Sequence, residues 1–78
     1  MPKVTIYSTP SCVYCKMAKA FFDQHKVAYE ERDVVADMKA REEMIAKSGQ
    51  LGVPVIDVGG AMVVGFDKGK LKELLKLQ

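Results

Sequence analysis

Alternating apolar and polar positions predict two strands in the first half of the chain. The first strand carries Val4 and Ile6 in the sequence KVTIYS, and the second is VAYEERDV, residues 27–34. Such a period of two is typical of a strand with one face packed on a core. Pro10 ends the first strand and disfavours a helical backbone at Thr9.

Two stretches have the apolar spacing of a helix. The first runs from Val13 to about His25, and its apolar positions form two adjacent rows that predict a buried stripe: Val13, Met17 and Phe21 in one row, and Tyr14, Ala18 and Phe22 in the next. The second is ADMKAREEMIAKSG, residues 36–49. Asp37 is suited to cap its start, and Gly49 is suited to end it.

The rest of the chain predicts a hairpin followed by a short helix. The β-branched runs Val53–Val58 and Ala61–Val64 meet at Gly59-Gly60, a pair typical of a tight turn. Asp67 is suited to cap a last helix, whose inward face is formed by four leucines: Leu71, Leu74, Leu75 and Leu77.

This order of elements predicts an α/β protein with the thioredoxin-like arrangement β-α-β-α-β-β-α. The first two strands flank a helix, so we expect them to be parallel with a right-handed crossover. The hairpin adds an antiparallel pair to a four-stranded mixed sheet with helices on both faces. At 78 residues, and with no linker or repeat, we expect one domain over residues 1–78.

Composition and charge exclude some classes of function. The net charge of +2 is too small to indicate binding of nucleic acid or of an anionic membrane surface. No apolar run approaches the roughly 18 residues of a membrane span. The opening MPKVTIYS reads as a strand and not as a signal peptide. We therefore expect a cytoplasmic protein that begins at Met1.

The chain has two cysteines, and both lie where the first strand gives way to the first helix, in the sequence SCVYC. Amide groups of the first turn should point at the sulfur of Cys12 and favour the thiolate. The helix dipole alone should lower a thiol pKa of about 8.5 by about one unit. Cys15 lies three positions later on the same side of the helix. This pattern predicts that Cys12 attacks a substrate disulfide and that Cys15 resolves the mixed disulfide.

Two other uses of a cysteine pair have less support. A structural zinc site usually needs four ligands, and the chain offers these two cysteines and His25, which lies at the far end of the helix. A zinc site shared by two chains stays open to metal analysis. A stabilising disulfide is unfavourable because so short a loop removes little entropy from the unfolded chain, and the cytoplasm keeps thiols reduced.

Three segments together resemble the glutaredoxins and the glutaredoxin-like redoxins of the thioredoxin-fold superfamily. They are VTIYSTPSCVYCKMAK, SGQLGVPVI and VVGFDKGKL, which fall in the order and spacing of the family. The likeness covers essentially the whole chain. The resemblance implies a cis peptide bond between Val53 and Pro54 that faces the cysteines. Val13 stands where glutaredoxins usually have proline, and it matches the redoxins that reduce ribonucleotide reductase.

The resemblance also implies a binding surface beside the catalytic Cys12 and Cys15. In glutaredoxins the cysteine moiety of glutathione pairs with the residue before the cis-proline, and its γ-glutamyl end meets the turn ahead of the last helix. The corresponding substrate-binding or glutathione-binding residues here are Tyr14, Val53, Pro54, Gly65, Phe66 and Asp67. Asp67 has two alternative roles, a partner for the glutathione ammonium group or a simple helix cap.

These residues predict a dithiol thiol–disulfide oxidoreductase with no tightly bound cofactor or metal. The expected partners are disulfide-containing proteins, ribonucleotide reductase among them, and the expected reductant is glutathione or a flavoenzyme of the thioredoxin reductase type. We expect a monomer. The alternative is a [2Fe–2S] carrier in which two chains hold the cluster through Cys12 and two glutathiones.

Overall fold

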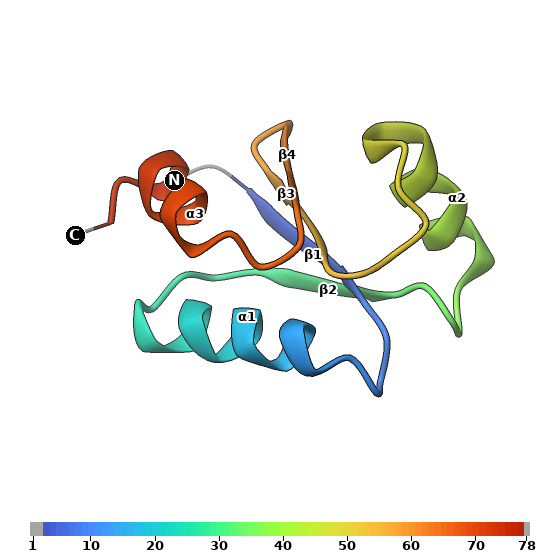
Figure 1. Ribbon diagram of the computed structural model, residues 1–78, viewed down its shortest axis with the longest axis horizontal. Coiled ribbons are helices and arrows are strands. Elements are labelled where there is room, and N and C mark those ends of the chain that lie inside the picture. The colour runs from blue at the N-terminus through green and yellow to red at the C-terminus, as the bar shows by residue number, and fades with distance from the viewer. Residues whose placement is uncertain (1–2, 78) are drawn as a thin grey trace.

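Four strands form one mixed sheet in the computed structural model, which describes residues 3–77 (Figure 1). The strands are β1 (Val4–Ser8), β2 (Glu30–Asp33), β3 (Val55–Val58) and β4 (Ala61–Val64). Their order in the sheet is β2-β1-β3-β4. β1 and β2 are parallel, and the other two pairs are antiparallel. The predicted element order and sheet are confirmed.

Three helices cover the sheet: α1 (Val13–Gln24), α2 (Met38–Ser48) and α3 (Lys68–Leu75). α1 and α3 lie on one face, and α2 lies on the other (Figure 1). Each face has its own core. The larger core includes Ile6, Phe22 and Leu71, while the smaller one is built around Tyr7 and Met44. None of these helices is long and apolar enough to cross a membrane.

The helix ends follow the predicted capping residues. The Asp37 carboxylate accepts hydrogen bonds from the backbone N–H groups of Lys39 and Ala40, at 3.0 and 3.2 Å. Gly49 ends α2 with φ of +70°, a left-handed conformation that favours glycine. The Asp67 carboxylate accepts a hydrogen bond from the Lys70 N–H at 3.1 Å, so its capping role is present in the structure.

The predicted buried stripe of α1 is wrong in its first turns. Val13 and Tyr14 are 65% and 62% exposed, and Met17 is 46% exposed. The side chains that α1 buries are Cys15, Ala18, Phe21 and Phe22. Cys15 is the first buried position of the stripe, and cysteine is among the residues most often buried.

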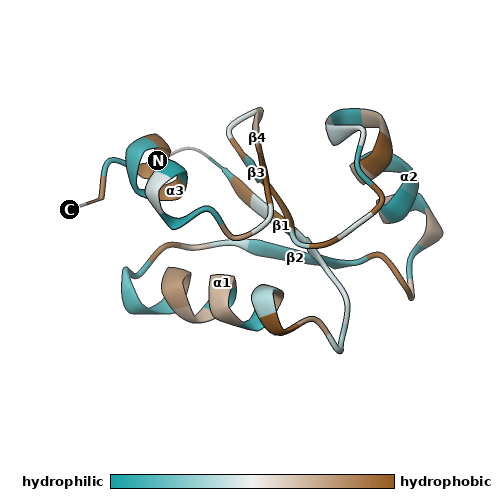
Figure 2. Ribbon diagram, in the orientation of Figure 1, coloured by the Kyte–Doolittle hydropathy of each residue, from teal (hydrophilic) through white to brown (hydrophobic). Residues whose placement is uncertain are grey.

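The strand predictions need three smaller corrections. β1 is buried along its whole length, Thr5 and Ser8 included, because helices cover both faces of the sheet. β2 spans only Glu30–Asp33, and its sequence EERD is hydrophilic throughout, as expected for a strand at the sheet edge (Figure 2). The first strand of the hairpin begins at Val55, after Pro54, and not at Val53.

Candidate active site

The two cysteines lie at the start of α1 and are joined by a disulfide, with their Cα atoms 5.2 Å apart. Cys12 is the residue that caps the helix, and its Sγ accepts a hydrogen bond from the backbone N–H of Cys15 at 3.0 Å. The amide of the first turn therefore points at the sulfur of Cys12, as the sequence predicted. Such a donor stabilises negative charge on that sulfur once the disulfide is reduced.

The two sulfur-bearing residues differ in exposure. Cys15 is fully buried, whereas Cys12 is half-buried at the tip of the helix. A substrate can therefore approach the sulfur of Cys12 more readily than that of Cys15. This asymmetry suits a pair in which one sulfur attacks and the other resolves.

A second segment lies at the same end of the sheet. The Val53-Pro54 peptide bond is cis, as expected, and Pro54 is buried. The carbonyl oxygen of Pro54 accepts a hydrogen bond from the N–H of Gly65 at 2.8 Å. Gly65 has φ of +79°, a conformation that a side chain would strain. This bond holds the turn after β4 beside the cis-proline.

The sheet register explains why these segments share one end. Tyr7, near the end of β1, pairs with Val55 at the start of β3, and Val55 pairs with Val64 at the end of β4. The cysteines follow β1, the cis-proline precedes β3, and Gly65 follows β4. The structure thus brings five of the predicted site residues to one end of the sheet: Cys12, Cys15, Val53, Pro54 and Gly65.

The other three predicted site residues have contacts of their own. Phe66 is half-buried and packs edge-to-face on Phe21, with ring centroids 5.8 Å apart. Asp67 caps α3. Tyr14 is exposed on the first turn of α1, next to the disulfide.

A charged cluster connects α1 to the sheet behind the cysteines. Lys19, four residues after Cys15, donates to the Glu31 carboxylate at 2.7 Å, and the buried Ser8 donates to the same oxygen at 2.8 Å. The hydrogen bond from Lys19, with the one from Ser8, holds the pKa of Glu31 below its ordinary value. The cluster fixes the second turn of α1 against the end of β1 and against β2.

Sequence reasoning missed a groove beside the cysteines. It has a volume of about 290 Å³. Its lining consists of Thr9, Val34, Val35, Met38, Arg41, Leu51, Gly52 and Val53. These residues come from three connecting segments and from the first turn of α2, so no single motif marks the groove in the sequence.

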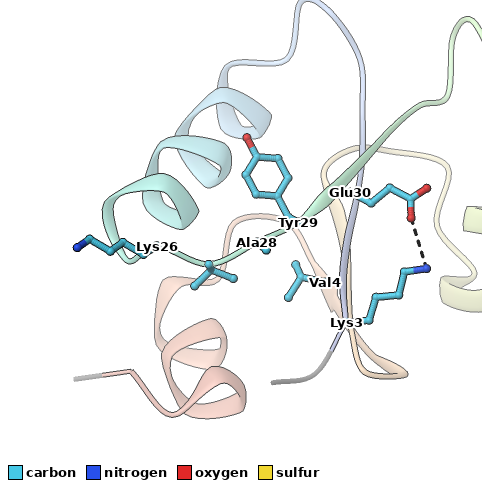
Figure 3. A pocket seen from close by; sticks show the side chains of 7 residues that line it. Lys3, Val4, Lys26, Ala28, Tyr29 and Glu30 are labelled. Carbon is cyan, nitrogen blue, oxygen red and sulfur yellow. Dashed lines mark ion pairs between the residues drawn. The ribbon is translucent and has the colours of Figure 1, made fainter.

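A larger cavity of about 540 Å³ lies at the opposite end of the sheet (Figure 3). It is lined by the first residues of β1 and by the segment that leads into β2, and Lys3 forms an ion pair with Glu30 at its edge, at 3.5 Å. Since the cysteines follow the other end of β1, this cavity is separate from the redox site. The described residues contain no cluster of three or more histidine, cysteine or acidic side chains that could hold a metal.

Comparisons of the sequence point to one family. The family model described as Glutaredoxin matches residues 4–63. A glutaredoxin-like 8.6 kDa protein encoded in the rubredoxin operon of Clostridium pasteurianum is 41% identical over 73 residues, which cover 94% of this chain and 97% of that protein. Glutaredoxin 3 of Escherichia coli K12 is 35% identical over 83 residues, covering 97% of this chain and 100% of its own.

Solved structures confirm the predicted fold. The glutaredoxin of Archaeoglobus fulgidus superposes with a TM-score of 0.87 at 30% identity, covering 97% of this chain and 88% of that one. A buckwheat glutaredoxin, solved as a complex with glutathione, has a TM-score of 0.75 at 24% identity and covers 92% and 68% of the two chains.

Proposed function

The chain belongs to the glutaredoxin family, and from this premise we propose that it is a dithiol oxidoreductase acting on protein disulfides and mixed disulfides. A thiol–disulfide redox role follows from the family itself. The observation that carries the dithiol mechanism is the hydrogen bond from the Cys15 N–H to the Cys12 sulfur.

In the first step the Cys12 thiolate attacks one sulfur of a substrate disulfide. A new bond forms between Cys12 and that sulfur, and the other substrate sulfur leaves as a thiolate and takes up a proton. The helix N-terminus and the Cys15 amide stabilise the attacking anion. The half-buried position of Cys12 gives the substrate access to it.

In the second step the Cys15 thiolate attacks the sulfur of Cys12. The Cys12–Cys15 disulfide forms, the bond to the substrate breaks, and the second substrate thiol is released. Two electrons have then passed from the protein to the substrate. Because Cys15 is buried and its Cα lies 5.2 Å from that of Cys12, it meets the mixed disulfide from within the protein.

The substrate lies along the cis-proline in this proposal. Neither the N–H nor the carbonyl of Val53 has a hydrogen-bond partner among the described residues, so both can pair with an extended segment. Pro54 keeps that segment beside the sulfurs. Glutathione, where it serves as substrate or reductant, lies across Tyr14 and Val53 and places its γ-glutamyl end at Gly65, Phe66 and Asp67.

Asp67 has room for a second role in this arrangement. Its Oδ1 accepts the capping bond from Lys70, which leaves Oδ2 for the ammonium group of glutathione. The complex of a buckwheat glutaredoxin with glutathione supports a glutathione site on this fold.

Coupled assays test the proposal and identify the reductant. NADPH oxidation is followed with a disulfide substrate, with either glutathione and glutathione reductase or thioredoxin reductase alone. Turnover with the first supports the assignment of Gly65, Phe66 and Asp67 to glutathione. Turnover with the second alone makes the flavoenzyme the electron donor. No turnover with either system would overturn the proposed function.

A further inference from the structure

The cavity between the start of β1 and the segment before β2 has the size and the walls of a small-molecule site (Figure 3). Its volume of about 540 Å³ lies within the range of roughly 300–1,000 Å³ that is typical of ligand pockets. Val4 and Val27 line it and are nearly fully buried. Tyr29 adds a half-buried ring that packs on Phe22, with ring centroids 5.4 Å apart. The cavity therefore offers a ligand an apolar surface that the core already holds in place.

The end of α1 builds one side of this cavity. The Val27 N–H donates to the Phe22 carbonyl at 2.8 Å, and the Lys26 N–H donates to the Asp23 carbonyl at 3.2 Å. This pair of bonds is a common helix ending, in which a left-handed residue is followed by an apolar one that packs back on the helix. Lys26 has φ of +56°, and Val27 is accordingly buried. The chain thus places the Lys26 side chain at the rim of the cavity, directly before an apolar wall.

The charges around the cavity favour an anion. Three charged side chains line it, and two of them, Lys3 and Glu30, form an ion pair with each other. The third is Lys26, whose ammonium group has no ion pair within residues 3–77. Figure 3 shows Lys26 at one end of the cavity and the ion pair at the other, with Val4 between them. One unpaired cation beside an apolar hollow suits a ligand with one negative charge and an apolar body.

We propose that this cavity binds an organic monocarboxylate with an apolar body, such as a medium-chain aliphatic acid. The apolar body lies over Val4 and Tyr29, and the carboxylate pairs with Lys26, whose flexible stem can turn toward it. Residues 26–30 span at most about 14 Å, a length that suits a small molecule. The site is separate from the redox chemistry, because the cysteines follow the other end of β1.

Two simpler ligands share only part of this chemistry. A small inorganic anion would leave the apolar walls uncovered, and an exposed lysine alone holds an anion weakly in water. A neutral apolar molecule would leave the charge of Lys26 unpaired, and a cationic one would be repelled by it. Probes that share either the charge or the chain of the proposed ligand can therefore separate these possibilities.

Titration of the full-length chain labelled with ¹⁵N tests the inference. Octanoate is added at low salt, and the shifts of the backbone amide resonances are recorded. Acetate supplies the charge without the chain, and octylammonium supplies the chain with the opposite charge. We expect saturable shifts with octanoate at Val4 and residues 26–30, with a dissociation constant of about 1–10 mM, as a ligand of so few atoms allows. Octylammonium should bind at least about fivefold more weakly, and acetate should not saturate.

Two glycine variants locate the carboxylate. Lys26→Gly removes the unpaired cation and keeps the left-handed backbone that glycine favours, so the helix end should persist. Lys76→Gly is its matched control, because Lys76 has the same φ of +56° after α3 and does not line the cavity. Lys26→Gly should weaken octanoate binding by about three- to fivefold, and Lys76→Gly should change it by less than about 1.5-fold.

A second pair of variants tests the apolar wall. Ala28 is exposed and lines the cavity, so Ala28→Glu leaves the core intact and puts a carboxylate where the octanoate chain lies. It should abolish the saturable shifts. Ala46→Glu adds the same charge at an exposed position of α2 outside the cavity and should leave binding intact.

Shifts that never saturate with octanoate would overturn the inference, and so would unchanged binding in Ala28→Glu. Octylammonium that binds as tightly as octanoate, or equal effects of Lys26→Gly and Lys76→Gly, would show that Lys26 does not hold a carboxylate. Octanoate shifts centred on the cysteines would place the ligand at the redox site instead. None of these results depends on the redox activity of the chain.

Discussion

Two clefts of similar size flank α2, and they differ in whether their charged side chains pair with one another. The cleft at the far end from the cysteines, about 260 Å³, includes three cations and three carboxylates in its lining. These charges pair with one another: Lys3 with Glu30, Arg32 with Glu43, and Lys47 with Glu43 and Asp57. The groove at the redox end, about 290 Å³, has apolar walls and one cation, Arg41.

At one end of the sheet the polar groups of the cleft find partners within the chain, and at the other end the exposed groups do not. At the far end, the protein satisfies its own charges, and the hydroxyl of the buried Tyr7 also donates to Glu43 at 2.9 Å. At the redox end, apolar side chains and the Val53 backbone remain without partners among the described residues. Substitutions at the redox end should therefore change activity more than stability, and those in the core should do the reverse.

The cysteines should give the largest effect on activity. Cys12→Ser should abolish turnover, because the chain has one other cysteine, Cys15, and its side chain is fully buried. Cys15→Ser should still attack and should accumulate a mixed disulfide that mass spectrometry detects. Both variants should unfold within about 1 kcal/mol of each other, since each loses the same short disulfide. A Cys15→Ser protein without a trapped intermediate would contradict the assigned roles.

The core of the α1 face should give the largest effect on stability. Phe22 is fully buried and packs against Phe21 and Tyr29. Phe22→Ala should lower the free energy of unfolding in urea by about 3–5 kcal/mol. The milder Phe22→Leu should cost less and should keep attack by Cys12 near that of the wild type.

Leu51→Ser is the matched variant at the redox end. Because Leu51 is largely exposed, Leu51→Ser should change the free energy of unfolding by less than about 0.5 kcal/mol. If Leu51→Ser lowered the free energy of unfolding nearly as much as Phe22→Ala, the distinction between the redox end and the core would be wrong.

Asp67 should show a moderate effect that separates its two roles. Asp67→Ala removes the cap of α3 and should cost about 1 kcal/mol of stability. Asp67→Asn keeps a capping oxygen but loses the charge, so its stability should stay close to that of the wild type. If Asp67 also binds the glutathione ammonium group, Asp67→Asn should raise the KM for glutathione. An unchanged KM would leave Asp67 as a helix cap alone.

The smallest predicted effect is on the stability of the fold at acid pH. Hydrogen bonds from Lys47 and Tyr7 hold the pKa of Glu43 below its ordinary value, and those from Lys19 and Ser8 do the same for Glu31. These carboxylates therefore stabilise the fold when ionised, and the contribution is lost as the pH falls below the ordinary value of 4.5. Thermal melts from pH 7 to pH 3 should show less acid sensitivity in Glu31→Gln and Glu43→Gln than in the wild type.

Local chemistry made most of the fold predictable. The caps at Asp37 and Asp67, the turn at Gly59-Gly60 and the end of α2 at Gly49 each depend on one or two residues whose backbone preference is strong. The position of the cysteines at a helix start was predictable for the same reason, since the strand, Pro10 and the helical spacing lie side by side in the sequence.

Features that depend on long-range packing were harder to predict. The spacing of apolar residues in the sequence shows which of them share a helix face. It does not show which turns of the helix project beyond the sheet. Val13 and Met17 were therefore expected in the core and are exposed. The groove was missed because Val35, Arg41 and Leu51 meet only once the ends of three strands come together.

Alkylation of the reduced protein across a range of pH tests the central claim most directly. Iodoacetamide is added at each pH, and peptide mapping by mass spectrometry identifies the modified cysteine. We predict that Cys12 reacts first, with a midpoint below the ordinary thiol pKa of about 8.5, and that Cys15 stays unmodified in the folded protein. Equal modification of both cysteines, or a Cys12 midpoint at or above 8.5, would contradict the assignment of Cys12 as the activated nucleophile.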